Sequence, residues 1–231
     1  MNKIKRELLN VLLFPVRYYE RLEDKKITLY AGILLVGVID LLLPDVAEVF
    51  KKLFTDRPSD DIFFNAVILA LAVVLVGIID VLFVGLPLYD FFNYLKKKET
   101  GYIHLDSDKG DNMIQIISNA GNTQHKATAV KVMKVYIMSH FLIIPVNTAM
   151  HFAFFRNLSE GSPEWVQNLV LAYSMIISIW SAAIMSRGIN TLFRFNPIFK
   201  RLTFIVVYIW NFLFGMVFDF QILKWVSQLF R

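Results

Sequence analysis

Five ionisable side chains interrupt stretches of the sequence that are otherwise apolar. They are Asp40, Asp80, His140, His151 and Asp219, and no Lys or Arg shares these stretches. An ionisable group in the hydrocarbon of a membrane is costly, so it normally faces the protein interior, pairs with another polar group or serves a function. Carboxylates and imidazoles can exchange protons and bind cations. These five residues are therefore the candidates for chemistry in this chain.

Asp80 is the most deeply placed of the five. It lies eight residues from the inner end of the apolar stretch 62–88, or about 12 Å at the rise of an α-helix. His140, five residues from the inner end of the stretch 135–155, is the nearest ionisable residue in depth. A pair of Asp80 and His140 would relay protons or hold a cation. The alternative is that Asp80 is simply protonated, because burial disfavours the charged carboxylate.

A second group of polar residues lies near the opposite membrane boundary. Asp40, His151 and Asp219 are each three or four residues from the outer ends of their stretches, so we expect them about 5–6 Å below the surface. Asn147 precedes His151 by four residues and shares its helix face. The sequence thus predicts an outer polar layer in which the two aspartates pair with His151 or Arg156.

The elements that position these residues are long apolar helices. A helix needs about 20 residues to cross the hydrocarbon core, and the chain is 56% hydrophobic and only 19% charged. The pattern predicts an all-α integral membrane bundle of five transmembrane helices, residues 27–231, preceded by an interfacial amphipathic segment, residues 1–26. The five predicted spans are 27–43, 62–88, 135–155, 165–185 and 203–223.

The distribution of Lys and Arg predicts the orientation of these spans. Cytoplasmic connections carry an excess of both residues. The segments 1–26, 89–134 and 186–202 hold seven, seven and four of them, whereas the other connections and the C-terminal tail hold three, one and two. We therefore expect the N-terminus in the cytoplasm and the C-terminus outside, in what is most simply a prokaryotic cell membrane.

The first 26 residues combine an apolar run with basic residues on both sides. No small-residue cleavage site follows the run, so an interfacial helix that Pro15 bends or breaks is a better interpretation than a signal peptide. The alternative is a helix packed against the protein's own bundle. The residues expected to contact anionic lipid headgroups are Lys3, Lys5, Arg6, Arg17 and Arg21.

One short motif occurs twice. Gly37-Val-Ile-Asp40-Leu-Leu returns as Gly77-Ile-Ile-Asp80-Val-Leu, and a proline follows each copy. Since Val, Ile and Leu exchange freely in membrane spans, only the glycine and the aspartate of this repeat carry information, and we draw no structural prediction from it.

Several functional classes lack their signatures in this sequence. The chain has no cysteine, which excludes disulfides, cysteine-ligated metals and thiol catalysis. We find no nucleophile elbow, HExxH motif or glycine-rich phosphate loop. The net charge of +5 is explained by the inner connections and not by a nucleic-acid-binding face. We therefore expect no enzyme, no cofactor and no nucleic-acid partner.

Two segments resemble a known family. The run from Asn10 to Leu22, with its Pro15 and paired tyrosines, resembles the opening of YIP-domain (Ypt/Rab-interacting) proteins. Ile179-Trp180, followed by Arg187-Gly-Ile-Asn190, is similar to that family's tryptophan and later glycine. The acidic region and the Asp-Leu-Tyr-Gly-Pro signature of eukaryotic members are absent, so the chain is more similar to short prokaryotic members.

The resemblance implies a five-span fold. The leading hypothesis is a non-enzymatic YIP-like protein that acts through lipids or a membrane-protein partner, and the small five-span bundle is compatible with a homodimer. The alternative, which rests on the intramembrane residues, is a small transporter or channel subunit for protons or cations that uses Asp80 and His140.

Overall fold

The computed structural model describes residues 7, 10–42, 62–106, 127–150 and 163–217, and every regular element in these segments is a helix. Residues 1–6, 8–9, 43–61, 107–126, 151–162 and 218–231 lie outside the described part. The helices are α2 (Val16–Glu20), α3 (Lys26–Leu42), α5 (Ile62–Asp106), α7 (Ala129–Met150), α8 (Glu164–Phe193) and α9 (Pro197–Val217).

Three of these helices are long and apolar enough to cross a membrane. They contain the segments Ala66–Glu99 of α5, Glu164–Phe193 of α8 and Pro197–Phe214 of α9. The described chain therefore has the character of a membrane protein. Helix α3, with 17 residues, covers most of the predicted span 27–43, and α7 covers most of the span 135–155. A crossing by these two helices stays a prediction.

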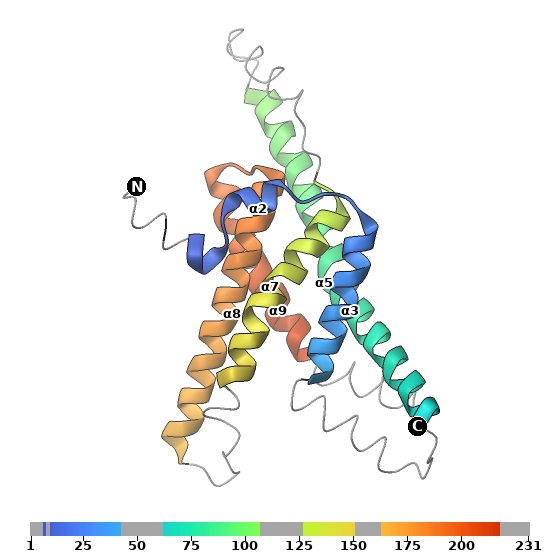
Figure 1. Cartoon of the computed structure of the whole chain (residues 1–231). Helices are drawn as coiled ribbons and strands as arrows, with labels where there is room; N and C mark the ends of the chain where they lie inside the picture. Colours follow the sequence, from blue (N-terminus) through green and yellow to red (C-terminus); the bar gives the residue numbers. More distant parts are fainter. Residues whose placement is uncertain (1–6, 8–9, 43–61, 107–126, 151–162, 218–231) are drawn as a thin grey trace.

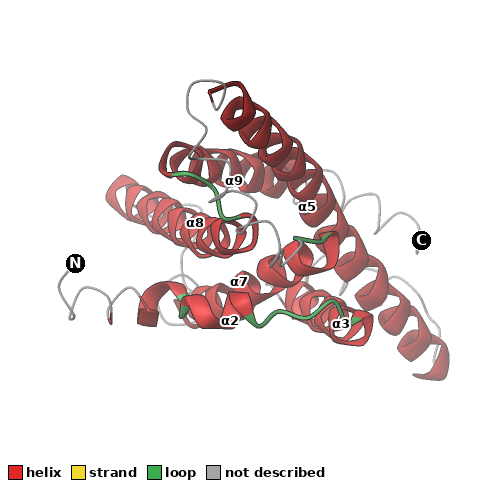
Figure 2. Ribbon diagram, turned by 90° about the horizontal axis from the view of Figure 1, so that it is seen from above, coloured by secondary structure: helices red, strands yellow, loops and turns green. Residues whose placement is uncertain are grey.

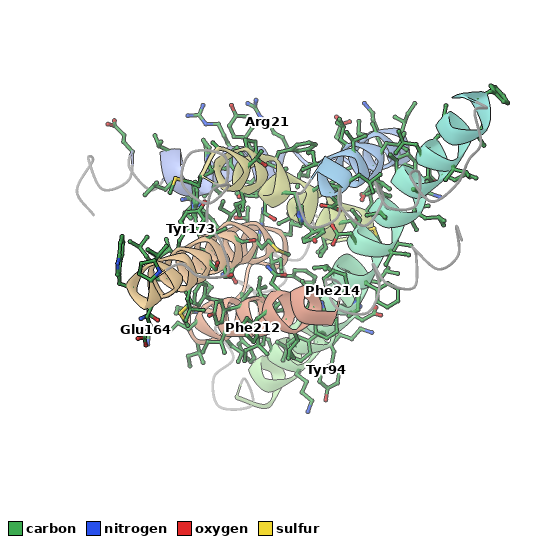
Figure 3. All side chains as sticks on the ribbon, turned by 90° about the horizontal axis from the view of Figure 1, so that it is seen from below. Arg21, Tyr94, Glu164, Tyr173, Phe212 and Phe214 are labelled. Carbon is green, nitrogen blue, oxygen red and sulfur yellow. The ribbon has the colours of Figure 1, made fainter. Side chains whose placement is uncertain are left out.

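Helix α7 occupies the centre of the arrangement. It contacts α3 and α5 on one side and α8 on the other, while α9 packs mainly on α8 (Figure 2). Helix α5 runs obliquely past its neighbours, and its last turns extend beyond the ends of the other helices (Figure 1). The ring of Phe83 on α5 stacks on that of Phe214 on α9, with the centroids 6.3 Å apart. Phe214 is labelled in Figure 3. These contacts join the two sides of the bundle.

Helices α3 and α5 cross where their backbones touch. A Cβ atom added to Gly37 would collide with the carbonyl oxygen of Val73, and one added to Gly77 would collide with the carbonyl oxygen of Ile33. The contact is reciprocal, with each glycine accommodating the backbone of the other helix. Small residues permit such close approach between membrane helices. The two glycines are the ones that the repeated motif has in common.

The start of α9 is held by a buried carboxylate from α5. Glu99 is 2% exposed, and its Oε1 accepts a hydrogen bond of 2.7 Å from the backbone N–H of Asn196. Its Oε2 lies 2.6 Å from Nζ of Lys96. A negative charge is favourable at a helix N-terminus, where backbone N–H groups lack partners. This interaction fixes the turn between α8 and α9 against α5.

The N-terminal segment is docked on α8. The chain leaves the helical conformation at Phe14 and Pro15 and then forms the short helix α2. Tyr19 is fully buried, and its hydroxyl lies 3.0 Å from the carbonyl oxygen of Leu13 and 3.3 Å from that of Ile184. The indole N–H of Trp180 donates to the Leu12 carbonyl at 2.7 Å. One side of the segment thus packs on the bundle, as the alternative interpretation of its sequence predicted.

Candidate functional site: a carboxylate–histidine cluster

Three helices bring polar side chains together in the interior of the bundle. Helix α3 supplies Asp40, α5 supplies Asp80, and α7 supplies Tyr136 and His140. One carboxylate oxygen from each aspartate and one ring nitrogen of His140 all lie within 4.8 Å of one another. Both aspartates are 3% exposed. We refer to these four residues as the carboxylate–histidine cluster.

Asp80 contacts two other members of this cluster, Tyr136 and His140. Its Oδ1 accepts a hydrogen bond of 2.7 Å from the hydroxyl of Tyr136. Its Oδ2 lies 3.5 Å from Nε2 of His140. The same ring nitrogen is 3.4 Å from the Tyr136 hydroxyl, and the two rings of α7 meet edge to face with centroids 4.4 Å apart. Tyr136 therefore orients both the carboxylate and the imidazole.

The crossing of α3 and α5 explains why the two aspartates meet. Each follows its glycine by three residues, and the two helices run in opposite directions along their line of contact. Side chains on a helix lean toward its N-terminus. Both carboxylates therefore lean back toward the Gly37–Gly77 contact, one from each side. The repeated motif thus produces a pair of acids at one crossing.

The charge in the cluster is unbalanced. Two carboxylates can carry two negative charges, while one imidazole can carry at most one positive charge. The five predicted spans contain no Lys or Arg. Like charges at this separation in a buried site disfavour ionisation of both groups. A proton on one carboxylate or a bound cation would relieve this repulsion.

The donor set suits a divalent cation. Carboxylate oxygens together with an imidazole nitrogen are ligands of zinc, manganese and related metal ions. The residues that would hold such an ion are Asp40, Asp80 and His140. Tyr136, which donates to the Asp80 carboxylate, would act as an outer-sphere partner that orients the ligand.

The structure places the predicted site residues differently in one respect. Asp80 and His140 lie side by side, at the distance given above. Asp40, however, was expected in an outer layer with His151 and Asp219, and its carboxylate instead lies in the cluster with Asp80. The meeting of Asp40 with Asp80 was not predicted, because counting residues along each helix leaves out where the helices cross. The outer polar layer stays a prediction. His151 and Asp219, and the side chain of Asn147, lie outside the described part.

Tyr136 was missed by the sequence analysis. It precedes His140 by four residues, so it continues the polar face of α7 by one turn toward the N-terminus of the helix. The signal for Asp40 was the repeated Gly-x-x-Asp motif. The spacing of Tyr136 from His140 and the Gly-x-x-Asp repeat both consist of common residue types. They could be recognised as parts of one site only once the positions of the helices were known.

The residues predicted to contact lipid headgroups are described only in part. Arg17 and Arg21 are exposed, and Arg21 points away from the helices in Figure 3. Lys3, Lys5 and Arg6 lie outside the described residues.

Tyr19 lies between Arg17 and Arg21 in the sequence. Burial raises the pKa of its phenol well above the usual value, and nearby Arg187 opposes this effect. The hydroxyl of Tyr19 therefore stays protonated and can donate its one proton to the carbonyl of Leu13 or Ile184, or share it between them.

Comparisons with known proteins add no further assignment. No family model, no curated protein and no solved structure matches this chain.

Proposed function

We propose that this chain is a small transporter or channel subunit that binds a cation at the carboxylate–histidine cluster in exchange for a proton. The observation that carries the proposal is the convergence of Asp40, Asp80 and His140 from three helices, with their ligand atoms within 4.8 Å. Ionisable residues inside membrane bundles commonly mark the pathways of ions and protons.

The exchange follows from the charge balance of the cluster. Without a bound cation, the two acids require at least one proton, because a buried pair of carboxylates resists double ionisation. A divalent cation requires deprotonated ligands and releases protons when it binds. Occupancy by the cation and occupancy by the proton are therefore alternatives at the same atoms. Such competition is the basis of coupled exchange.

The proposal includes the five-span topology with a cytoplasmic N-terminus. Helices α3 and α7 each contribute to the cluster. Both are formed by stretches of the sequence that are apolar over about the length of a span. The larger number of Lys and Arg residues in the segments 1–26, 89–134 and 186–202 supports this orientation. Under this topology, Asp80 lies within the membrane.

A flux measurement tests the transport proposal. Native protein in proteoliposomes is compared with Asp80→Asn for proton movement and Mn²⁺ uptake. We expect flux from the native protein and none from the variant. Asp90→Asn is the matched control, because Asp90 is an exposed aspartate on the same helix. Folded native protein that moves neither protons nor Mn²⁺, or an Asp80→Asn variant with full flux, would overturn the proposal.

A second candidate function is that of a YIP-like protein that acts through lipids, with membrane attachment through the N-terminal segment that the sequence predicts to be interfacial. The specific observation is that Val11 is 77% exposed and Tyr18 is 54% exposed, while Arg17 and Arg21 are exposed nearby. Apolar side chains beside basic ones are typical of segments that lie at the lipid boundary.

Spin labelling tests this second function directly. Because the chain contains no cysteine, a single Val11→Cys substitution gives one defined site for a nitroxide label. In liposomes, we expect the label to be more accessible to oxygen, which partitions into lipid, than to a water-soluble nickel chelate. The reverse order would place residue 11 in water and exclude lipid contact there. A Glu23→Cys label, at an exposed charged position, serves as the reference.

A further inference from the structure

A pocket lies where the N-terminal segment meets the end of α8 and the start of α9. Its volume is about 580 Å³, and it is separate from the carboxylate–histidine cluster. Three of its lining residues are basic, namely Arg187, Arg194 and Lys200, and one is acidic, Glu20. We refer to it as the basic pocket. The excess of positive charge points to an anionic ligand.

The basic side chains are positioned by helix ends. Arg194 terminates α8 in a left-handed conformation, with φ of 51°. Its backbone N–H bonds to the carbonyl of Asn190, and its own carbonyl accepts a bond from Lys96 at 3.3 Å. Lys200 lies in the first turn of α9, and its backbone N–H donates to the carbonyl of Asn196. The two basic residues are therefore held at a turn that α5 supports.

Arg187 connects the pocket to the N-terminal segment. Its Nη2 donates a hydrogen bond of 2.7 Å to Oδ1 of Asn10, and the next helix turn carries Asn190 and Thr191, which also line the pocket. A guanidinium has five N–H donors in a planar fork that matches the oxygens of a phosphate. It can therefore contact an anion while it keeps its bond to Asn10.

The remaining wall of the pocket is apolar. Leu13 and Val16 come from the N-terminal segment, while Phe195 and Phe204 come from the turn and from α9. The first turns of α9 also expose Ile198 and Leu202 at the surface. A free inorganic anion has no apolar surface that could pack against these side chains. The combination of basic and apolar lining matches an amphiphile with a charged head and a hydrocarbon chain.

The position along the helices agrees with such a ligand. The pocket lies at the ends of α8 and α9 that the Lys and Arg distribution assigns to the cytoplasmic side. Phospholipid headgroups occur at this level, and basic pockets between membrane helices on this side bind them. We propose that the basic pocket binds the phosphate headgroup of an anionic glycerophospholipid, with an acyl chain along its apolar wall. This inference does not depend on the transport proposal.

Glu20 distinguishes the headgroups that can enter. Its carboxylate adds negative charge to the rim and weakens the attraction for an anion. We therefore expect Glu20→Gln to tighten binding of phosphatidylglycerol. A zwitterionic headgroup with a primary amine would instead use Glu20 as a partner, and this substitution would weaken its binding.

Native mass spectrometry of the full-length, delipidated protein tests the proposal. Phosphatidylglycerol and phosphatidylcholine with the same acyl chains are titrated in mild detergent. We expect a preference for phosphatidylglycerol that falls by about fivefold for each basic residue removed, first in Arg194→Gln and then in Arg194→Gln with Lys200→Gln. The matched control is Lys97→Gln with Arg201→Gln, since both residues are exposed and neither lines the pocket.

Three outcomes would overturn the proposal. Equal losses in the pocket variant and in the control would mean that surface charge alone attracts the lipid. Displacement of phosphatidylglycerol by an equal concentration of water-soluble glycerol phosphate would mean that the apolar wall contributes nothing. Preference for phosphatidylethanolamine that requires Glu20 would also contradict an anionic occupant. Because the assay contains no transported ion, its result is independent of the flux experiment.

Discussion

The carboxylate–histidine cluster and the basic pocket are two polar regions built by different means. The cluster is composed of side chains that face one another across packed helices, and its aspartates are buried. The pocket is open and is composed of basic residues at helix ends. The cluster has two acidic members and one imidazole, and the lining of the pocket has three basic residues and one acidic residue. Under the two proposals, the protein would bind a cation in its interior and an anion at its edge.

A substitution at the crossing of α3 and α5 should have the largest effect, and it should affect the cluster. Gly77→Ala places a methyl group against the backbone of α3, and overpacking of this kind costs about 1–3 kcal/mol or more when the backbone must move. We expect a lower thermal unfolding midpoint in detergent and a loss of cation binding at the cluster. Ala70→Val is the control, because residue 70 is exposed on the same helix. An unchanged midpoint in Gly77→Ala would mean that the helices are not in backbone contact.

A change of pH should separate the two regions. Protons compete with a cation for the carboxylate and imidazole atoms of the cluster, so Mn²⁺ affinity should fall as the pH falls, by about tenfold per unit for each proton displaced. Arg and Lys keep their charge over the range from pH 7.5 to 5.5. Phosphatidylglycerol binding at the pocket should therefore stay nearly constant. Electron paramagnetic resonance for Mn²⁺ and native mass spectrometry for the lipid provide the two measurements.

Removal of one hydroxyl should sharpen the assignment of the cluster. Tyr136→Phe deletes the 2.7 Å hydrogen bond to Asp80 without changing the packing of the ring. Loss of an outer-sphere partner weakens metal binding by about 10- to 100-fold, so we expect Mn²⁺ affinity to fall by that factor while lipid binding stays the same. Tyr30→Phe controls for the loss of a hydroxyl at an exposed position. Unaltered Mn²⁺ affinity in Tyr136→Phe would remove this residue from the site.

The smallest effect is expected at the docked N-terminal segment. Tyr19→Phe removes hydroxyl contacts to two backbone carbonyls, and a hydrogen bond of this kind contributes about 1 kcal/mol. We expect a modest decrease in the unfolding midpoint and weaker phosphatidylglycerol binding, because this segment forms one wall of the pocket. Tyr18→Phe, at an exposed position, should change neither quantity. Equal behaviour of the two variants would show that docking does not depend on the hydroxyl.

The helical character and much of the cluster could be predicted from the sequence. Apolar length identified the helices, and the depths of Asp80 and His140 suggested their pairing. The position of Asp40 could not be predicted, because counting residues measures distance along one helix axis, whereas the meeting of two side chains depends on where the axes cross. The Gly-x-x-Asp repeat contained that information, but its meaning required the orientation of one helix relative to the other.

The basic pocket was less accessible to sequence analysis. Arg187, Arg194 and Lys200 belong to a connection recognised only as rich in basic residues. Their convergence depends on the left-handed turn after α8 and on the docking of the N-terminal segment. Both depend on contacts between residues far apart in the chain, which residue types and spacing do not specify.

The backbone contact at Gly37 and Gly77 has a mechanical consequence. With each helix seated in the notch of the other, the pair cannot slide along its length without a clash, but it can change its crossing angle about that point. The contact is therefore a pivot about which the angle between α3 and α5 can change. Asp40 and Asp80 lie one helical turn from this pivot, where the helices are displaced least. Under the transport proposal, opening the far ends of α3 and α5 would admit or release an ion while the two carboxylates stay close together.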